Sequence, residues 1–288
     1  MPRQDYLQIV QSLTPLINHE LREKRIPSIA VALVDDQQTV WAQGFGFADP
    51  AQKQEASAGT VYRVGSVSKL VTDIGIMRLV EQGKVNLDAP VSDIIPDFHP
   101  HNPFGGKITL RELMCHRSGL VREPPEGHYF DSRPPGHAEV VQSLNETTLI
   151  YPPGTHTKYS NAGITVVGYA LEQQAAQPFV QYLKASVLDP MGLRSSAFEP
   201  TASLTHNLAK AEMWTYDGRF FPAPTFQLGT FPAGSLYTTV TDLGRFESVQ
   251  DVIQEGVRVE GAEQRIHPLP TVVKVVAGEV GLEIPDTV

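Results

Sequence analysis

Two short motifs most strongly constrain how this chain folds. Ser66-Val67-Ser68-Lys69 opens an amphipathic stretch, and Tyr159-Ser160-Asn161 follows far along the chain, in a predicted loop. A serine and a lysine three residues apart lie on one face of a helix. A tyrosine brought to the same point can relay the proton of the serine. The sequence therefore predicts a serine acyl-transfer site with a lysine/tyrosine base, which needs neither histidine nor metal.

The stretch from Ser66 to Gln82 is expected to form a strong helix, which Gly83 ends. Its apolar residues predict one buried face, made of Val67, Leu70, Val71, Ile74, Met77 and Val80. Gly65, directly before the motif, permits a tight turn of the backbone ahead of Ser66.

The remaining pattern places strands early and helices later. Apolar spacing predicts a helix over 6–24, and the runs 29–34 and 39–41 predict a β-hairpin. Further helices are expected over 109–115, 161–174 and 179–188, and from Thr241 through Phe246. The first of these carries a capping box, with Thr109 as N-cap and Glu112 three residues on. This order predicts an α/β sheet layer with an all-helical lobe inserted into it.

Composition excludes several classes of partner. The 288 residues carry a net charge of −9, which argues against nucleic acid and against attachment to anionic lipid. No stretch approaches the roughly 18 apolar residues of a membrane span. Cys115, the single cysteine, excludes an internal disulfide and is expected to be a small buried residue. The start of the sequence shows no signal peptide, so a cytoplasmic protein is expected, or a periplasmic or secreted one if the true start lies upstream.

The candidate residues Ser66, Lys69 and Asn161 are expected to have different chemical roles. Serine is a weak nucleophile without a base, and Lys69 serves as one if the site lowers its pKa. Asn161 is positioned to hold a substrate amide or to orient Lys69. Each motif also has a plain structural interpretation: a capped helix start with a solvated lysine, and Asn161 as a helix N-cap. The histidines at 99, 101, 128 and 137 are interpreted as surface-loop residues, so no metal site is expected.

At this point the chain resembles the serine β-lactamase/penicillin-binding-protein superfamily, in the branch of class C β-lactamases and related esterases and D-peptidases. The resemblance covers residues 5 to 246 and is carried by the stretches 62–69, 79–85, 113–120, 153–161, 188–193 and 233–246. It implies a β-lactamase/transpeptidase-like α/β (α+β) fold: an antiparallel sheet flanked by helices, with an inserted all-helical lobe.

The resemblance also implies roles for the motif residues. Ser66 would be the acylated nucleophile, Lys69 the base and Tyr159 the proton relay, while Asn161 would contact substrate. No cofactor is implied, and the partner would be a small-molecule or peptide substrate. The oligomeric state is left open.

The chain departs from the family after residue 246. The family carries Lys/His-Thr/Ser-Gly on a strand that follows the tyrosine motif, and no such tripeptide follows Asn161 here. Arg117-Ser118-Gly119 matches the letters but precedes Tyr159, and the strand-like run 272–276 offers Lys274 as a weak substitute. We therefore expect a hydrolase domain over 5–246 and an atypical tail over 247–288, from truncation or a change of reading frame. The tail should be loosely packed or irregular, the sheet incomplete at its C-terminal end, and one sheet edge unpaired beside the site.

Two functions follow as hypotheses. The first is a serine hydrolase that forms an acyl-enzyme with an ester, an amide or a β-lactam. The second is a catalytically deficient, truncated member that acts as a binding module or remnant. The intact serine, lysine and tyrosine favour the first hypothesis, and the missing third motif favours the second.

Overall fold

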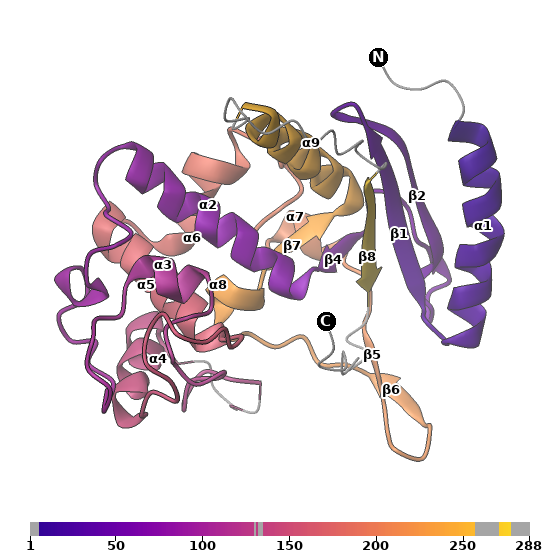
Figure 1. The fold of residues 1–288 in the computed structure, drawn as a ribbon. Helices are drawn as coiled ribbons and strands as arrows, with labels where there is room; N and C mark the ends of the chain where they lie inside the picture. Colours follow the sequence, from indigo (N-terminus) through magenta and orange to yellow (C-terminus); the bar gives the residue numbers. More distant parts are fainter. Residues whose placement is uncertain (1–5, 130, 132–134, 257–270, 278–288) are drawn as a thin grey trace.

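The structure is a computed structural model that describes residues 6–129, 131, 135–256 and 271–277. A small antiparallel sheet with one helix on its outer face forms one side of the molecule, and a lobe of helices forms the other (Figure 1). The first half of the chain begins on the sheet side and then enters the lobe, and residues 237–256 and 271–277 return to the sheet side. The predicted fold class is confirmed.

The sheet is built on an early hairpin, as the sequence predicts. Strands β1 (Ser28–Asp35) and β2 (Gln38–Asp49) pair antiparallel, and the turn residues Asp36 and Gln37 both have positive φ, 49° and 61°. Such turns match the twist of the paired strands. Helix α1 (Tyr6–Glu23) packs on this hairpin with its buried residues Ile17 and Leu21. β3 (Gln54–Glu55) extends the sheet beyond β2.

The C-terminal part of the chain adds a strand that was not expected to pair. β8 (Thr271–Ala277) runs antiparallel to β1 along its length, from Ser28↔Ala277 to Val34↔Thr271, which gives the order β3-β2-β1-β8. The expectation of an irregular tail is therefore wrong for these residues, and β8 is the outer strand of the sheet among the residues that the structure describes. β1 lies inside the sheet, and its residues are buried from Ser28 to Val34, the pattern of a strand whose two faces are both covered, here by α1 and α9.

The lobe is organised around two helices, α2 (Ser68–Glu81) and α5 (Asn161–Ala175), which pack against each other within one large apolar core. Smaller elements surround them: 3₁₀ helices η1 (Gly65–Val67), η2 (Val91–Asp93) and η3 (Leu144–Glu146), π-helix η4 (Lys184–Leu188), and helices α3 (Leu110–Met114), α4 (His137–Ser143), α6 (Phe179–Leu183), α7 (Ala202–Thr205) and α8 (Phe231–Gly234).

Short elements join the lobe to the sheet. β4 (Val61–Arg63), which precedes η1, pairs with β7 (Tyr237–Thr239), which follows α8. α9 (Val240–Gly256) lies against β1 and β2. A separate hairpin, β5 (Glu212–Trp214) with β6 (Phe220–Pro222), extends away from the body (Figure 1).

The buried face of α2 differs from the predicted one. Leu70 and Met77 are 47% and 45% exposed, whereas the polar residues Ser68, Lys69 and Thr72 are buried. The helix is rotated because Ser68 and Thr72 make hydrogen bonds to the α8 segment, which requires them to face inward. Apolar spacing alone could not show this, because polar residues that find partners also occupy buried positions.

Two smaller expectations had opposite outcomes. The capping box of α3 is confirmed: Thr109 Oγ1 accepts from the amide of Glu112, and the Glu112 side chain accepts from the amide of Thr109. Cys115 was expected to be buried and is exposed, because it follows the last residue of α3 where the helix ends. In the described parts of the chain, no helix is long and apolar enough to cross a membrane.

Candidate active site

Ser66 lies in the turn where the sheet side meets the lobe. β4 ends at Arg63, Gly65 takes a positive φ of 53°, and Ser66 then occupies the 3₁₀ turn that leads into α2. The side chain of Ser66 is exposed. The tight turn thus presents an accessible hydroxyl at a helix start, where the helix dipole favours negative charge.

Lys69 is buried beside this hydroxyl. Its side chain points back toward the start of the helix, as side chains on helices generally do, and Nζ lies 3.1 Å from Ser66 Oγ. Nζ also donates to the backbone carbonyl of Ala233 at 2.7 Å. The residue is 6% exposed. The interpretation of Lys69 as a solvated lysine is therefore wrong, because burial and two hydrogen bonds fix its amine at the serine.

The α8 segment holds Lys69 from the opposite side, and we call residues 231–236 the α8 wall. Its carbonyls and amides meet side chains of α2: Thr72 Oγ1 donates to the carbonyl of Pro232 at 2.8 Å, and the amide of Leu236 donates to Ser68 Oγ at 2.9 Å. On its far side α5 approaches closely, because Gly168 has no side chain there; an added Cβ would lie 2.5 Å from Pro232 Cγ.

Tyr159 comes to the same point from the loop before α5. Its hydroxyl lies 2.5 Å from Ser66 Oγ, and its ring centroid lies 4.7 Å from Lys69 Nζ. The ring is flanked by His116, with centroids 4.6 Å apart, and by the guanidinium of Arg122 at 5.4 Å. Ser66 Oγ therefore sits between two groups that can exchange a proton with it.

Asn161 begins α5 but does not cap it. Ser160 is the N-cap, because its Oγ accepts from the amide of Gly163 at 2.8 Å, so the interpretation of Asn161 as N-cap is wrong. Asn161 Nδ2 instead donates to Glu123 Oε1 at 2.5 Å. The other carboxylate oxygen of Glu123 is shielded from solvent and has no hydrogen-bond partner among the described residues.

Burial changes the acid–base properties of the site. It lowers the pKa of Lys69 from 10.5 to about 8, partly offset by the negative charge of Glu123, while Arg122 lowers it further. Burial raises the pKa of Tyr159, which the hydrogen bond from Ser66 partly counteracts. Burial and the charge of Lys69 lower the pKa of His116. Lys69 therefore has an accessible neutral form near neutral pH, as a base requires.

Several residues around Lys69 escaped the sequence analysis. Glu123 and Ala233 could not be placed there from local patterns, because both reach the site through long-range packing. Asp73 carried a usable signal: it lies four residues after Lys69, which puts it on the same helix face.

Other sequence candidates lie elsewhere or outside the described residues. Arg117, in the tripeptide that matches the third motif, donates to the carbonyl of Gly154. The side chain of Lys274 lies outside the description of β8. His137 is enclosed by aromatic rings and donates to the carbonyl of Thr165 at 3.0 Å, so it is not a surface-loop residue. No cluster of metal-binding side chains is found within the described ranges.

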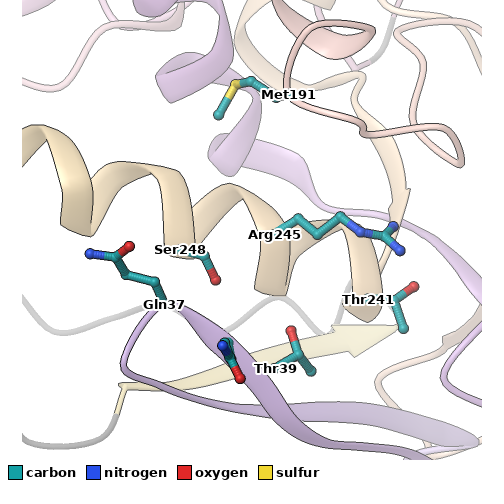
Figure 2. A pocket seen from close by; sticks show the side chains of 7 residues that line it. Gln37, Thr39, Met191, Thr241, Arg245 and Ser248 are labelled. Carbon is teal, nitrogen blue, oxygen red and sulfur yellow. The ribbon is translucent and has the colours of Figure 1, made fainter. Parts of the chain in front are cut away.

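A cavity of about 440 Å³ lies apart from these residues, between the β1–β2 turn and α9 (Figure 2). Its labelled side chains come from the turn (Gln37), from β2 (Thr39), from α9 (Thr241, Arg245 and Ser248) and from Met191 of the lobe. Arg245 Nη1 is engaged with Asp242 Oδ1 at 2.9 Å. The cavity lining holds no nucleophile with an adjacent base, so it does not compete with the Ser66 site.

Residues 13–278 match the family described as "Beta-lactamase". The chain belongs to the beta-lactamase family. The predicted membership of the serine β-lactamase/penicillin-binding-protein superfamily is thereby confirmed.

Curated relatives in this family are distant. The chain is 24% identical to "Protein flp" of Staphylococcus aureus (strain COL) over 234 residues, which cover 81% of this chain and 47% of that protein. It is 29% identical to "Beta-lactamase-like protein 2" of Dictyostelium discoideum over 238 residues, with 79% and 43% covered. The chain thus spans about half the length of the curated relatives it matches.

Solved structures share the fold. An octameric penicillin-binding protein homologue from Pyrococcus abyssi superposes with a TM-score of 0.77 at 26% identity, covering 86% of this chain and 57% of that one. EstCE1, a hydrolase with promiscuous acyltransferase activity, gives 0.73 at 25% identity, with 84% and 72% covered. FmtA from Staphylococcus aureus gives 0.69 at 21% identity, with 83% and 65% covered, and supports the fold alone.

Proposed function

We propose that this beta-lactamase family chain is a serine hydrolase that acts through an acyl-enzyme on an ester, an amide or a β-lactam. One observation carries the proposal: Ser66 Oγ lies 3.1 Å from Lys69 Nζ and 2.5 Å from the Tyr159 hydroxyl. The lowered pKa of Lys69, about 8, supports its role as base. The description of EstCE1 as a hydrolase with acyltransferase activity supports an acyl-enzyme route.

In the proposed reaction Ser66 Oγ attacks the carbonyl carbon of the substrate. Its proton passes to neutral Lys69 directly or through Tyr159, and the carbonyl π bond opens to an oxyanion. The intermediate collapses as the bond to the leaving group breaks, and the leaving group takes the proton through Tyr159. Water then attacks the acyl carbon and gives up a proton to the same pair. The bond between the acyl carbon and Ser66 Oγ breaks, the pair returns the proton to Oγ, and an acid product leaves.

The substrate is a small molecule or a peptide in this proposal. Asn161 lies two residues after Tyr159 and is hydrogen-bonded to Glu123 at 2.5 Å, and in this proposal it contacts the substrate amide or carbonyl. All four candidate residues fall within residues 5–246, which we assign to the hydrolase domain, with 247–288 as an atypical C-terminal tail.

Covalent labelling tests the proposal. Incubate the chain with a fluorescent fluorophosphonate and, separately, with a fluorescent penicillin, and map the adduct by peptide mass spectrometry. We expect a single adduct on Ser66 that disappears in Ser66→Ala and persists in Ser203→Ala, which alters an exposed serine of α7. An adduct that survives in Ser66→Ala, or no adduct in the native chain, contradicts the proposal.

The second candidate is a catalytically deficient member that binds without turnover. Its support is the absence of Lys/His-Thr/Ser-Gly after Asn161, because that motif supplies one amide donor to the oxyanion, and losing one donor costs about 10²–10³ in rate. Adduct formation followed by hydrolysis of the label favours the hydrolase. A chain whose Ser66 is labelled but which does not turn over an activated ester favours the deficient form.

A further inference from the structure

The hairpin of β5 and β6 carries a concentration of exposed apolar side chains. In the described part of the chain fourteen large apolar residues are exposed, and five of them lie within residues 213–221. Met213, Trp214, Phe220 and Phe221 are 40–57% exposed, and Tyr216 is fully exposed. Single exposed apolar residues are normal, whereas a contiguous patch of several hundred square ångströms marks an interaction site. The proposed hydrolase function assigns no role to this patch.

The apolar residues cover both faces of the hairpin. Met213 is paired with Phe221, and Trp214 with Phe220, across the two strands. Paired residues point to the same face and successive residues to opposite faces, so each face carries one of the two pairs. Among the described residues, β5 and β6 pair with each other alone, and an isolated two-stranded hairpin is at best marginally stable in water. A partner that covers these faces would therefore stabilise the hairpin.

The hairpin is nevertheless a well-formed element. At its base the amide of Lys210 donates to the carbonyl of Ala48 at 2.7 Å, which ties the hairpin to β2. At its turn the amide of Thr215 donates to the carbonyl of Arg219 at 2.9 Å, and Gly218 takes a positive φ of 80°. The aromatic side chains thus stand on a hydrogen-bonded scaffold that extends away from the body (Figure 1).

The charge of the hairpin suits a second copy of this chain. The whole chain has a net charge of −9, whereas the charges within residues 210–222 cancel: two basic residues, Lys210 and Arg219, and two acidic residues, Glu212 and Asp217. Two copies therefore meet at the hairpin without a local excess of like charge. In a two-fold arrangement the same patch serves both copies, so basic groups of one hairpin can face acidic groups of the other.

The exposed area is of the size that a small dimer interface needs. A whole aromatic side chain covers about 150–250 Å², so the exposed fractions of the four aromatic residues leave roughly 500 Å² on each copy. Two copies would bury about 1,000 Å² through these residues alone, which is the lower limit for a specific interface. Tryptophan and tyrosine are also the residue types that contribute most to binding at such interfaces.

We propose that the β5–β6 hairpin is a self-association site: the hairpins of two copies pack against each other about a two-fold axis and cover each other's aromatic side chains. A membrane fits the hairpin less well. The outer edges of its two strands would lose water in hydrocarbon without gaining backbone partners, and the net charge of −9 disfavours anionic lipid. The dimer does not rest on the hydrolase proposal, because the candidate catalytic residues lie outside the hairpin.

Sedimentation velocity of the full chain from about 1 to 100 µM measures the association. We expect a reversible shift from the 31.6 kDa monomer to a species of twice that mass. For so small an interface a Kd on the order of 10 µM is expected. Trp214→Thr, which keeps a residue that favours strands, and Tyr216→Ser should each raise the Kd about tenfold or more. Phe104→Thr is the control, because it removes a similarly exposed ring from the loop before α3 and should leave the Kd unchanged.

Fluorescence locates the contact. The chain has two tryptophans, Trp41 and Trp214, so Trp41→Phe leaves Trp214 as the single reporter. Its emission should shift to shorter wavelength as the concentration rises through the Kd, because the indole leaves water when the hairpins pack together. An emission maximum that stays constant while the dimer forms would place the interface elsewhere and overturn the inference.

The remaining outcomes are equally decisive. A chain that stays monomeric up to about 100 µM overturns the inference, as does a dimer whose Kd is unchanged in both Trp214→Thr and Tyr216→Ser. A monomeric chain that binds phosphatidylcholine vesicles, with binding lost in Trp214→Thr, assigns the hairpin to a membrane instead. Labelling of Ser66 bears on none of these results, so the hydrolase proposal and the self-association site stand or fall separately.

Discussion

The two sides of the candidate site are built in different ways. The α8 wall, residues 231–236, holds the base with buried backbone groups, as in the 2.7 Å contact between the Ala233 carbonyl and Lys69. The side formed by residues 116–123, which we call the loop wall, uses side chains instead, and its Arg122 is 67% exposed. Backbone groups in a packed core have one position, whereas half-exposed side chains can adjust. The candidate base Lys69 is therefore held by backbone groups of the fold, whereas residues 116–123 approach the site with side chains that can adjust.

The largest effect is expected for Lys69 and Tyr159, between the two walls, and it tests whether these two residues act as one proton-transfer unit. Lys69→Ala and Tyr159→Phe should each reduce the rate of Ser66 acylation by roughly 10²-fold or more. The double variant should lose about as much as either single one, because groups that act as a unit give non-additive losses. Stopped-flow acylation with an activated ester measures all three. If the loss of rate in the double variant equals the product of the two single losses, the two residues act independently.

The next effect is the pH dependence of Ser66 acylation, which reports on Lys69, the residue that the α8 wall contacts. With a Lys69 pKa of about 8, the neutral amine is about a tenth of the total at pH 7. Acylation should therefore rise nearly tenfold between pH 6 and pH 7 and level off above pH 8. The folded pKa lies below the ordinary 10.5, so Lys69 also makes the free energy of unfolding rise with pH between about 8 and 10.5. A flat acylation profile from pH 6 to 8 would exclude Lys69 as the base.

A glycine pair on α5 tests the rigidity of the α8 wall. Gly168→Ala places a Cβ 2.5 Å from Pro232 Cγ, whereas at Gly163 the nearest contact would be an ordinary 3.4 Å. Gly168→Ala should lower the free energy of unfolding by about 1–3 kcal/mol and reduce acylation several-fold, as the displaced wall moves the Ala233 carbonyl. Gly163→Ala should be neutral or stabilising, because alanine favours helix. Urea unfolding measures the free energy of unfolding of both variants. Equal values would mean that the α8 wall shifts to accept the added Cβ at little energetic cost.

The smallest effect is expected at Asn161, which is hydrogen-bonded to Glu123 of the loop wall. Asn161→Ala removes the 2.5 Å hydrogen bond to Glu123 and the proposed contact to substrate, while the hydrogen bonds of Ser66 and Lys69 remain. We expect KM to rise about threefold to tenfold and kcat to change less, since a lost binding contact acts before the chemical step. Steady-state kinetics on an amide or ester substrate measure both constants. A large fall in kcat with unchanged KM would instead assign Asn161 to the orientation of Lys69.

Local patterns predicted the parts of this protein that depend on nearby residues. The hairpin over β1 and β2, the capping box of α3, and the placement of Ser66 and Lys69 on one face of a helix all follow from spacing within a few residues. The hydrogen bonds and side-chain periods that specify them lie inside a single element, so the sequence carries them directly.

Tertiary structure decided the rest. It brought Tyr159 to 2.5 Å from Ser66, supplied the Ala233 carbonyl to Lys69, and rotated α2 so that polar residues face inward. It also placed β8 beside β1, against the expectation from the sequence. These features depend on contacts between residues far apart in the chain, where a buried polar group is stable because a distant segment provides its partner. No local period encodes that partner, and the packing of the whole lobe selects it.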